Sequence, residues 1–139
     1  FRGHLFEGGY LTAQRLVEPD ERLPVFTLNE FDPQQRNAEL LKWLEDHRVD
    51  AIITNLAAVP EMLESIGIRV PDDVALATTT LLDTTITAGI DQHPEEIGRV
   101  GFLMLNSLIN DGSRGVPEIF RQNLVEGSWI DGDSVPDRR

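Results

Sequence analysis

A strand, helix and strand pattern in the middle of the chain constrains the fold most. Residues 50–54 read Asp-Ala-Ile-Ile-Thr, an apolar run of strand length, and residues 74–77 read Val-Ala-Leu-Ala. Residues 59–66 between them carry apolar side chains at helical spacing, and Gly67 can end a helix in the left-handed conformation. Continuous apolar strands are typical of a parallel sheet buried on both faces. The pattern therefore predicts a right-handed β-α-β crossover unit.

The clearest periodic signal lies further along the chain, in residues 94–110. One apolar stripe runs along this segment for more than three helical turns. Its members are Ile97, Val100, Gly101, Met104, Leu105, Leu108 and Ile109. Pro94 suits a first helical turn, and Asp111-Gly112 suits a helix end. The spacing predicts a helix over residues 94–110.

Weaker patterns extend the alternation of strands and helices over the rest of the chain. Helices are expected over residues 6–17 and from a cap at Asp32 to about His47, and strands at residues 24–28, 85–89 and 118–125. Strands that alternate with helices predict an α/β fold, with a mostly parallel sheet flanked by helices.

Composition excludes several classes of function. The 139 residues carry 12 basic and 24 acidic side chains, a net charge of −12, which repels phosphate backbones and argues against nucleic-acid binding by this segment itself. Without cysteine there can be no disulfide, thiolate metal site or cysteine nucleophile. No run of about eighteen apolar residues is present, so no membrane contact is expected. These features fit a cytoplasmic protein.

Familiar catalytic and cofactor motifs are missing from the sequence. It contains no Gly-x-Gly-x-x-Gly, Walker or Gly-x-Ser-x-Gly pattern. The histidines at 4, 47 and 93 have no ligand spacing, so we expect no metal and no cofactor. The pairs Asp72-Asp73 and Glu95-Glu96 follow a proline turn and open a helix, positions that explain their charges without catalysis.

Polar residues that follow the predicted strands are the best candidates for a ligand site. Asn55 follows the strand at 50–54, and Gln92 follows the strand at 85–89. Ligands of open parallel sheets bind beyond the carboxyl ends of the strands, and an amide offers both donors and an acceptor to a hydroxylated molecule. A cap or turn role would explain either residue equally well. Asp83, in a threonine-rich loop, is a weaker third candidate.

The two tryptophans leave two interpretations open. Trp43 and Trp129 could each stack on a sugar ring. Trp43 also fits the apolar stripe of the helix expected to end near His47, which favours a place in the core.

Two strings in the second half resemble the effector-binding domain of lactose-repressor-type (LacI-type) transcription regulators, which shares its type I fold with periplasmic sugar-binding proteins. They are Val70-Pro71-Asp72-Asp73-Val74-Ala75-Leu76 and Gly89-Ile90-Asp91-Gln92-His93-Pro94-Glu95-Glu96-Ile97-Gly98-Arg99. Residues 50–55 are similar to the family's strand that ends in an Asn facing the ligand. Gly9-Tyr10-Leu11-x-Ala13 is similar to the helix that begins the second lobe.

The resemblance implies a partial domain. Residues 1–139 would form a single partial effector-binding domain: the second lobe plus a crossing segment at 90–112. The DNA-binding helix-turn-helix headpiece and most of the first lobe would lie outside it. The protein would then be a cytoplasmic repressor-like regulator that contacts DNA only through that headpiece, and it would not be an enzyme.

The same resemblance assigns roles to residues. Asn55 and Gln92 would contact a small effector, a sugar or similar carbohydrate. Asp83 or Arg2 would be additional candidates, which the resemblance itself does not assign. Effector binding would control DNA binding allosterically. Ala77-Thr78-Thr79-Thr80 stands where the family often has Gly-aromatic-Asp-Asp, and Phe6 stands where it often has Arg, which argues against an ionic grip on the effector.

The family also implies a homodimer. The helix at 94–110 would belong to the first lobe, so its apolar stripe needs another partner here, and we expect it to pack across a neighbouring chain or to be swapped. Two alternatives remain: an α/β enzyme fragment that uses Asp83 or Asp91 with His93 as acid and base, and a plain dimerisation module.

Overall fold

The computed structural model describes residues 3–27, 32, 35–116, 119 and 121–137. The chain divides into two compact units, Phe1–Val49 and Asp50–Arg139.

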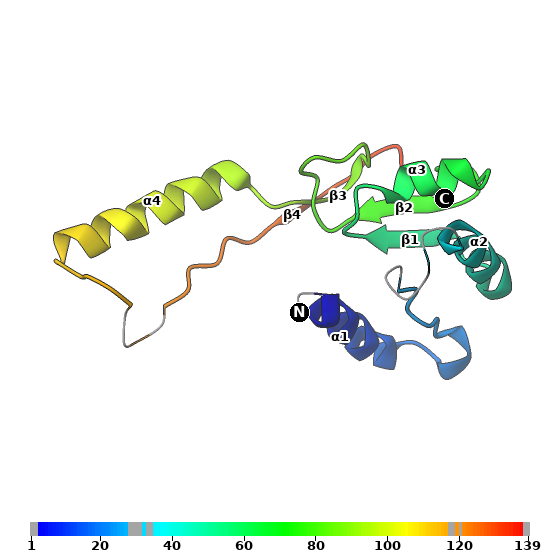
Figure 1. Cartoon of the computed structure of the whole chain (residues 1–139), viewed down its shortest axis with the longest axis horizontal. Helices are drawn as coiled ribbons and strands as arrows, with labels where there is room; N and C mark the ends of the chain where they lie inside the picture. The colour runs from blue at the N-terminus through cyan, green and yellow to red at the C-terminus, as the bar shows by residue number, and fades with distance from the viewer. Residues whose placement is uncertain (1–2, 28–31, 33–34, 117–118, 120, 138–139) are drawn as a thin grey trace. The chain divides into compact units, whose positions relative to one another are not determined.

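The first unit is helical. α1 spans Gly3–Ala13, two short 3-10 turns follow at Gln14–Leu16 and Pro19–Glu21, and α2 spans Arg36–His47 (Figure 1). The helix expected over residues 6–17 therefore begins and ends earlier than its apolar spacing suggests.

α2 ends at His47 as predicted, but it does not begin directly after Asp32. The carbonyl oxygen of Asp32 accepts the backbone N–H groups of Gln35 and Arg36, both at 2.9 Å, and this turn precedes the helix. Gln35 occupies the N-cap position without a side-chain capping bond.

The strand expected at residues 24–28 is wrong for the residues that the structure describes. Residues 24–27 pair with no described strand, and residue 28 lies outside the described part. Phe26 packs against Trp43 of α2 instead, with ring centroids 5.6 Å apart.

The second unit is an α/β layer. Its elements are β1 (Ala51–Thr54), α3 (Val59–Ser65), β2 (Ala75–Thr78), β3 (Ala88–Asp91), α4 (Pro94–Asn110) and β4 (Ser128–Ile130). The sheet order is β1-β2-β3-β4; the first three strands are parallel, and β4 is antiparallel to β3 (Figure 1). The predicted α/β class with a mostly parallel sheet is therefore confirmed.

The core of this unit lies around β2. All four residues of β2 are buried, and α3 contributes the buried side chains of Val59 and Leu63. Ile86 and Ala88, which precede and open β3, are buried as well. The predicted β-α-β unit around α3 thus carries most of the buried apolar side chains of the second unit.

β1 is not buried on both faces, contrary to the prediction. It is the edge strand of the described sheet, with β2 as its one neighbour, and the Ile53 side chain is 74% exposed. Apolar composition alone does not distinguish a central strand from an edge strand whose outer face lacks cover.

The strand expected at 85–89 begins three residues later than predicted, at Ala88, and is β3. Thr84 Oγ1 accepts the N–H of Ile86 at 3.2 Å, and this turn delays pairing until Ala88.

The strand expected at 118–125 is also wrong among the described residues of that stretch. β4 forms later, after Gly127, where a β-carbon would lie 2.6 Å from the Cγ2 atom of Ile90. A side chain at position 127 would therefore collide with β3 just before the residue where β4 begins.

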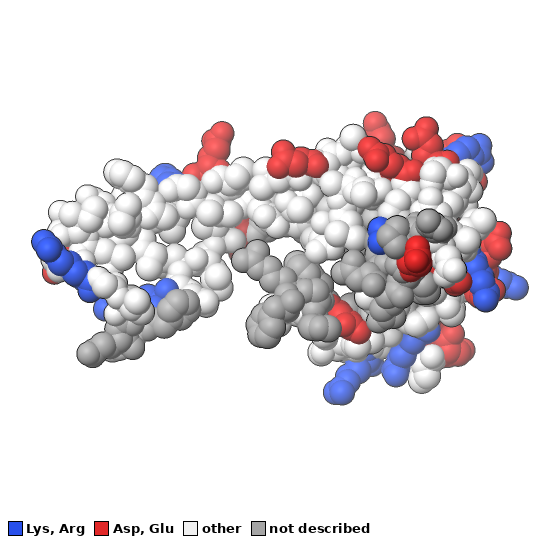
Figure 2. Space-filling view, in the orientation of Figure 1, with Lys and Arg blue, Asp and Glu red and all other residues white. Residues whose placement is uncertain are grey.

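α4 has the predicted bounds, but none of its described residues is buried. The stripe residues Val100, Met104 and Leu108 are half-buried, while Ile97, Leu105 and Ile109 are exposed. Residues 100–110 carry no charge, and Figure 2 shows the visible surface of this helix as largely uncharged.

Candidate functional site

The carboxyl ends of β1, β2 and β3 meet at one edge of the sheet, because the three strands are parallel. The backbone N–H of Thr79 donates to the carbonyl oxygen of Thr54 at 2.9 Å, which links the exits of β1 and β2. The Nε2 atom of Gln92 donates to the carbonyl oxygen of Thr79 at 3.1 Å, which links the exits of β2 and β3. Asn55 and Gln92 therefore follow strands at the same edge, each next to Thr79.

Threonine side chains fix the backbone at this edge. The N–H of Leu56 donates to Thr54 Oγ1 at 3.0 Å, a local turn that carries Asn55 out of β1. The hydroxyl of Thr78 donates to the Thr80 carbonyl at 2.8 Å and accepts the Thr80 N–H at 3.2 Å. The threonine-rich stretch thus satisfies its own polar groups and forms a rigid exit for β2.

The two amides keep hydrogen-bonding capacity. Both side chains are exposed; within the described residues Asn55 makes no side-chain hydrogen bond, and Gln92 makes only the bond to Thr79. An amide carries two N–H donors and a carbonyl acceptor. This edge can therefore offer donors and acceptors to an uncharged ligand.

Asp83 lies in a different hollow, of about 610 Å³. The hollow is lined by Ala57, Pro60, Glu61, Glu64, Asp83, Thr84 and Thr85. Its charged lining residues are all acidic, and Asp83 adopts the left-handed conformation with φ 54°. Asp83 thus lines the same hollow as residues of α3, and no hydrogen bond among the described residues links it to Asn55 or Gln92. Arg2 lies outside the described residues.

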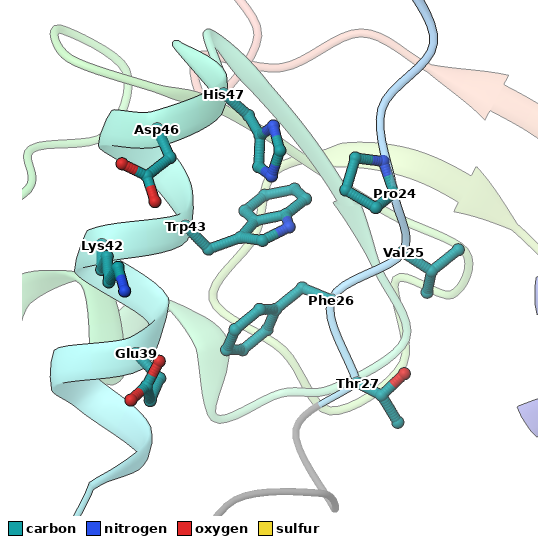
Figure 3. A pocket seen from close by; sticks show the side chains of 9 residues that line it. All are labelled: Pro24, Val25, Phe26, Thr27, Glu39, Lys42, Trp43, Asp46 and His47. Carbon is teal, nitrogen blue, oxygen red and sulfur yellow. The ribbon is translucent and has the colours of Figure 1, made fainter.

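Trp43 belongs to an aromatic cluster in the first unit. Figure 3 shows the Phe26 and Trp43 rings next to each other, with His47 beside Trp43, in the lining of a hollow of about 280 Å³. The Trp43 and His47 centroids are 5.3 Å apart, and Trp43 Nε1 is buried without an acceptor among the described residues. Because its ring packs against these two neighbours, a core role fits Trp43 better than sugar stacking.

Trp129 is half-exposed on β4. Its Nε1 donates to Asp131 Oδ1 at 2.7 Å, and 48% of the residue is accessible. Among the described residues, no hydrogen bond links Trp129 to Asn55 or Gln92.

A cluster of three polar side chains joins β3 to β4. The Oγ of Ser128 lies 3.0 Å from Nε2 of His93, and Nδ1 of His93 lies 3.3 Å from Oδ2 of Asp91. The other Asp91 oxygen, Oδ1, accepts the backbone N–H of His93 at 2.8 Å. Sequence reasoning paired Asp91 with His93 but missed Ser128, because the antiparallel register that sets Ser128 opposite Asp91 depends on the unpredicted strand β4.

The adjoining first turn of α4 carries an ion pair. Arg99 donates to Glu96 from Nε at 2.7 Å and from Nη2 at 2.5 Å. This bidentate contact lowers the pKa of Glu96. Both groups are solvent-exposed, so the pair contributes little to stability.

Within the described ranges, no group of three or more His, Asp or Glu side chains could hold a metal ion. Nor does any described helix combine the length and the apolarity that a membrane span requires.

Comparison with protein-family models, with curated proteins and with solved structures gives no match to this chain.

Proposed function

We propose that this chain is the second-lobe part of the effector-binding domain of a LacI-type transcription regulator, and that it binds a small, uncharged, hydroxyl-rich metabolite such as a sugar. The observation that carries the proposal is the bond from Gln92 Nε2 to the Thr79 carbonyl. It brings the amide that follows β3 beside the exit of β2, and the N–H of Thr79 donates in turn to the carbonyl oxygen of Thr54, the residue before Asn55. Open parallel sheets hold ligands at this edge.

The chemistry of the edge favours a neutral effector. The exits of β1 and β2 present an amide and threonine side chains, and no Lys or Arg follows either strand within residues 54–68 or 79–92. With a net charge of −12, the chain would also repel a phosphorylated ligand. A sugar hydroxyl both donates and accepts, which matches the amides of Asn55 and Gln92.

The mechanism would be allosteric. An effector held between this lobe and a first lobe would favour one relative orientation of the two, because it contacts both only in that orientation. The same orientation would set the spacing of DNA-binding headpieces outside this chain. The regulator would act in the cytoplasm, where its DNA lies.

Calorimetric titration with neutral mono- and disaccharides, each paired with its phosphate ester, tests the proposal. We expect a neutral sugar to bind and its phosphate ester to bind more weakly. Asn55→Ala or Gln92→Ala should each weaken binding about 5- to 10-fold, the effect of one lost hydrogen bond of about 1–1.5 kcal/mol.

Asn106→Ala and Gln122→Ala are matched controls, since both amides are exposed and lie outside this edge. Neither should change the affinity. Unchanged affinity in both Asn55→Ala and Gln92→Ala, or a response to charged compounds only, would contradict the proposed site.

We further propose that the chain forms a homodimer through α4. Its apolar side chains are unburied in the single chain, and isolated soluble helices with such a face are uncommon. Sedimentation velocity should show a dimer that Leu105→Gln shifts toward monomer. Leu82→Gln, which changes an exposed leucine outside α4, should leave the dimer intact. A monomer at all concentrations would exclude this interface.

A further inference from the structure

We propose that Ser128, His93 and Asp91 form a nucleophilic site, in which Ser128 accepts an acyl group from small activated esters. The sequence left open an acid and base pair of Asp91 and His93, and the structure adds Ser128 to it. The proposal rests on two contacts, Ser128 Oγ to His93 Nε2 at 3.0 Å and His93 Nδ1 to Asp91 Oδ2 at 3.3 Å. A serine, a base and a carboxylate in this sequence of contacts are recognised by geometry and not by position in the chain.

In the proposed site the proton of His93 lies on Nδ1, because this nitrogen is 3.3 Å from Asp91 Oδ2 and a carboxylate accepts hydrogen bonds. In that tautomer Nε2 is the acceptor, and the Ser128 hydroxyl, 3.0 Å away, is the donor. A general base requires this arrangement.

The backbone holds these groups in place. Asp91 and Ser128 are opposite one another in the antiparallel pair β3-β4, so their side chains share a face of the sheet. His93 adopts the left-handed conformation with φ 51°, held by its own N–H bond to Asp91 Oδ1 at 2.8 Å. Non-glycine residues in this conformation are uncommon and recur at functional sites.

The reaction follows from the contacts. Ser128 Oγ bonds to the carbonyl carbon of the ester while its proton passes to His93 Nε2. The adduct then expels the alcohol oxygen, which takes that proton, and the acyl group stays on Ser128. A water molecule then attacks the acyl carbon while its proton passes to His93 Nε2, and Ser128 Oγ leaves and takes that proton. The net reaction converts ester and water into acid and alcohol. Asp91 acts through His93 and is a positioning residue.

The exposure of the site limits the substrate class. The side chains of His93 and Asp91 are 40% and 39% accessible, so the site does not enclose a large acyl group. Short acyl chains with a good leaving group, such as p-nitrophenyl acetate, fit this geometry best.

The test is acetylation of the intact chain by p-nitrophenyl acetate at pH 8, followed by peptide mapping. Ser128 should be acetylated about 100-fold faster than Ser65, the typical effect of a positioned general base. Ser65 is a matched internal reference because it is exposed and donates to the Met62 carbonyl at 2.7 Å. Equal rates at Ser128 and Ser65 would overturn the proposal without any variant.

Three variants assign the roles. Ser128→Ala should remove the acetylated peptide. His93→Asn should slow Ser128 acetylation about 100-fold, and asparagine tolerates the left-handed backbone. Asp91→Asn keeps an acceptor for the His93 N–H but favours the wrong tautomer of the imidazole, so the Ser128 acetylation rate should no longer depend on pH as it does in the unsubstituted chain. An unchanged rate in folded His93→Asn would overturn the base assignment. Sugar titration of the same preparation reports on the effector site alone, so either proposal can fail while the other stands.

Discussion

A β-carbon on Gly89 would lie 2.3 Å from the carbonyl oxygen of Thr78 and 2.6 Å from its Cγ2 methyl group. The two residues are register partners in the parallel pair β2-β3, so neither backbone can move away without disturbing the ladder. Gly89→Ala should therefore lower the free energy of unfolding by about 1–3 kcal/mol, the usual effect of overpacking. Urea unfolding followed by circular dichroism measures the change.

Gly98→Ala is the control for this substitution. Gly98 lies in α4, where an added β-carbon meets no atom within 4 Å, and alanine favours helix over glycine. We expect no loss of stability. Similar losses in both variants would show that the Thr78 contact is not the cause.

Leu63→Ala should destabilise the chain more strongly. Leu63 is 0% exposed and anchors α3, so its truncation leaves a cavity and removes buried apolar contacts. The expected loss is about 2–5 kcal/mol in the free energy of unfolding. Leu82→Ala, at a position 48% exposed outside α4, should change it by about 0.5 kcal/mol or less. A loss in Leu82→Ala as large as in Leu63→Ala would mean that burial of Leu63 is not the cause.

Local periodicity predicted α3 and β2 because their side chains carry the packing, so helical or strand spacing coincides with burial. It predicted α4 from the longest apolar stripe of the chain, although none of the described residues of that helix is buried. The strand expected at 24–28 does not form in the described residues, because strand-forming residues also need a neighbouring strand to pair with. Phe26 packs against the ring of Trp43 instead.

Only the part of the candidate site that follows from the order and direction of the strands could be predicted. Parallel strands place Asn55 and Gln92 at one edge, so residues at strand ends could be inferred before the structure. The Ser128 contact depends on the antiparallel register that sets Ser128 opposite Asp91, which spacing along the sequence does not reveal.

The Asp73 carboxylate should raise the free energy of unfolding, and this contribution should disappear in acid. Its carboxylate accepts from the side chain and backbone N–H of Arg69, each at 2.9 Å, and these bonds lower the pKa of Asp73 from 3.8 to about 2. Because the unfolded chain binds this proton more readily, the contribution is full above about pH 4 and disappears as the pH falls through about 2. Asp73→Asn should therefore flatten the acid dependence of the unfolding free energy in this window. The effect should be modest, since the pair is exposed.

Asp72→Asn is the matched comparison for Asp73. Asp72 lies 3.5 Å from the Nη1 atom of Arg69 and is 66% exposed. Its substitution should alter the acid limb less than Asp73→Asn does. Equal effects of the two variants would mean that the negative charge near Arg69, and not the bidentate hydrogen bond of Asp73, makes the free energy of unfolding depend on pH.

Ser134 ties the chain end to the core of the sheet. Its Oγ accepts the N–H of Ala88 at 3.0 Å, its own N–H donates to Thr87 Oγ1 at 3.0 Å, and its carbonyl oxygen accepts the N–H of Leu76 at 2.8 Å. Ala88 is 0% exposed, so Ser134→Ala leaves a buried N–H without its acceptor. The loss should be about 1–3 kcal/mol in the free energy of unfolding, measured by urea titration. Ser113→Ala, at an exposed position, should be neutral. If Ser134→Ala were equally neutral, water would have to reach the Ala88 N–H, and the end of the chain could not be packed over the start of β3.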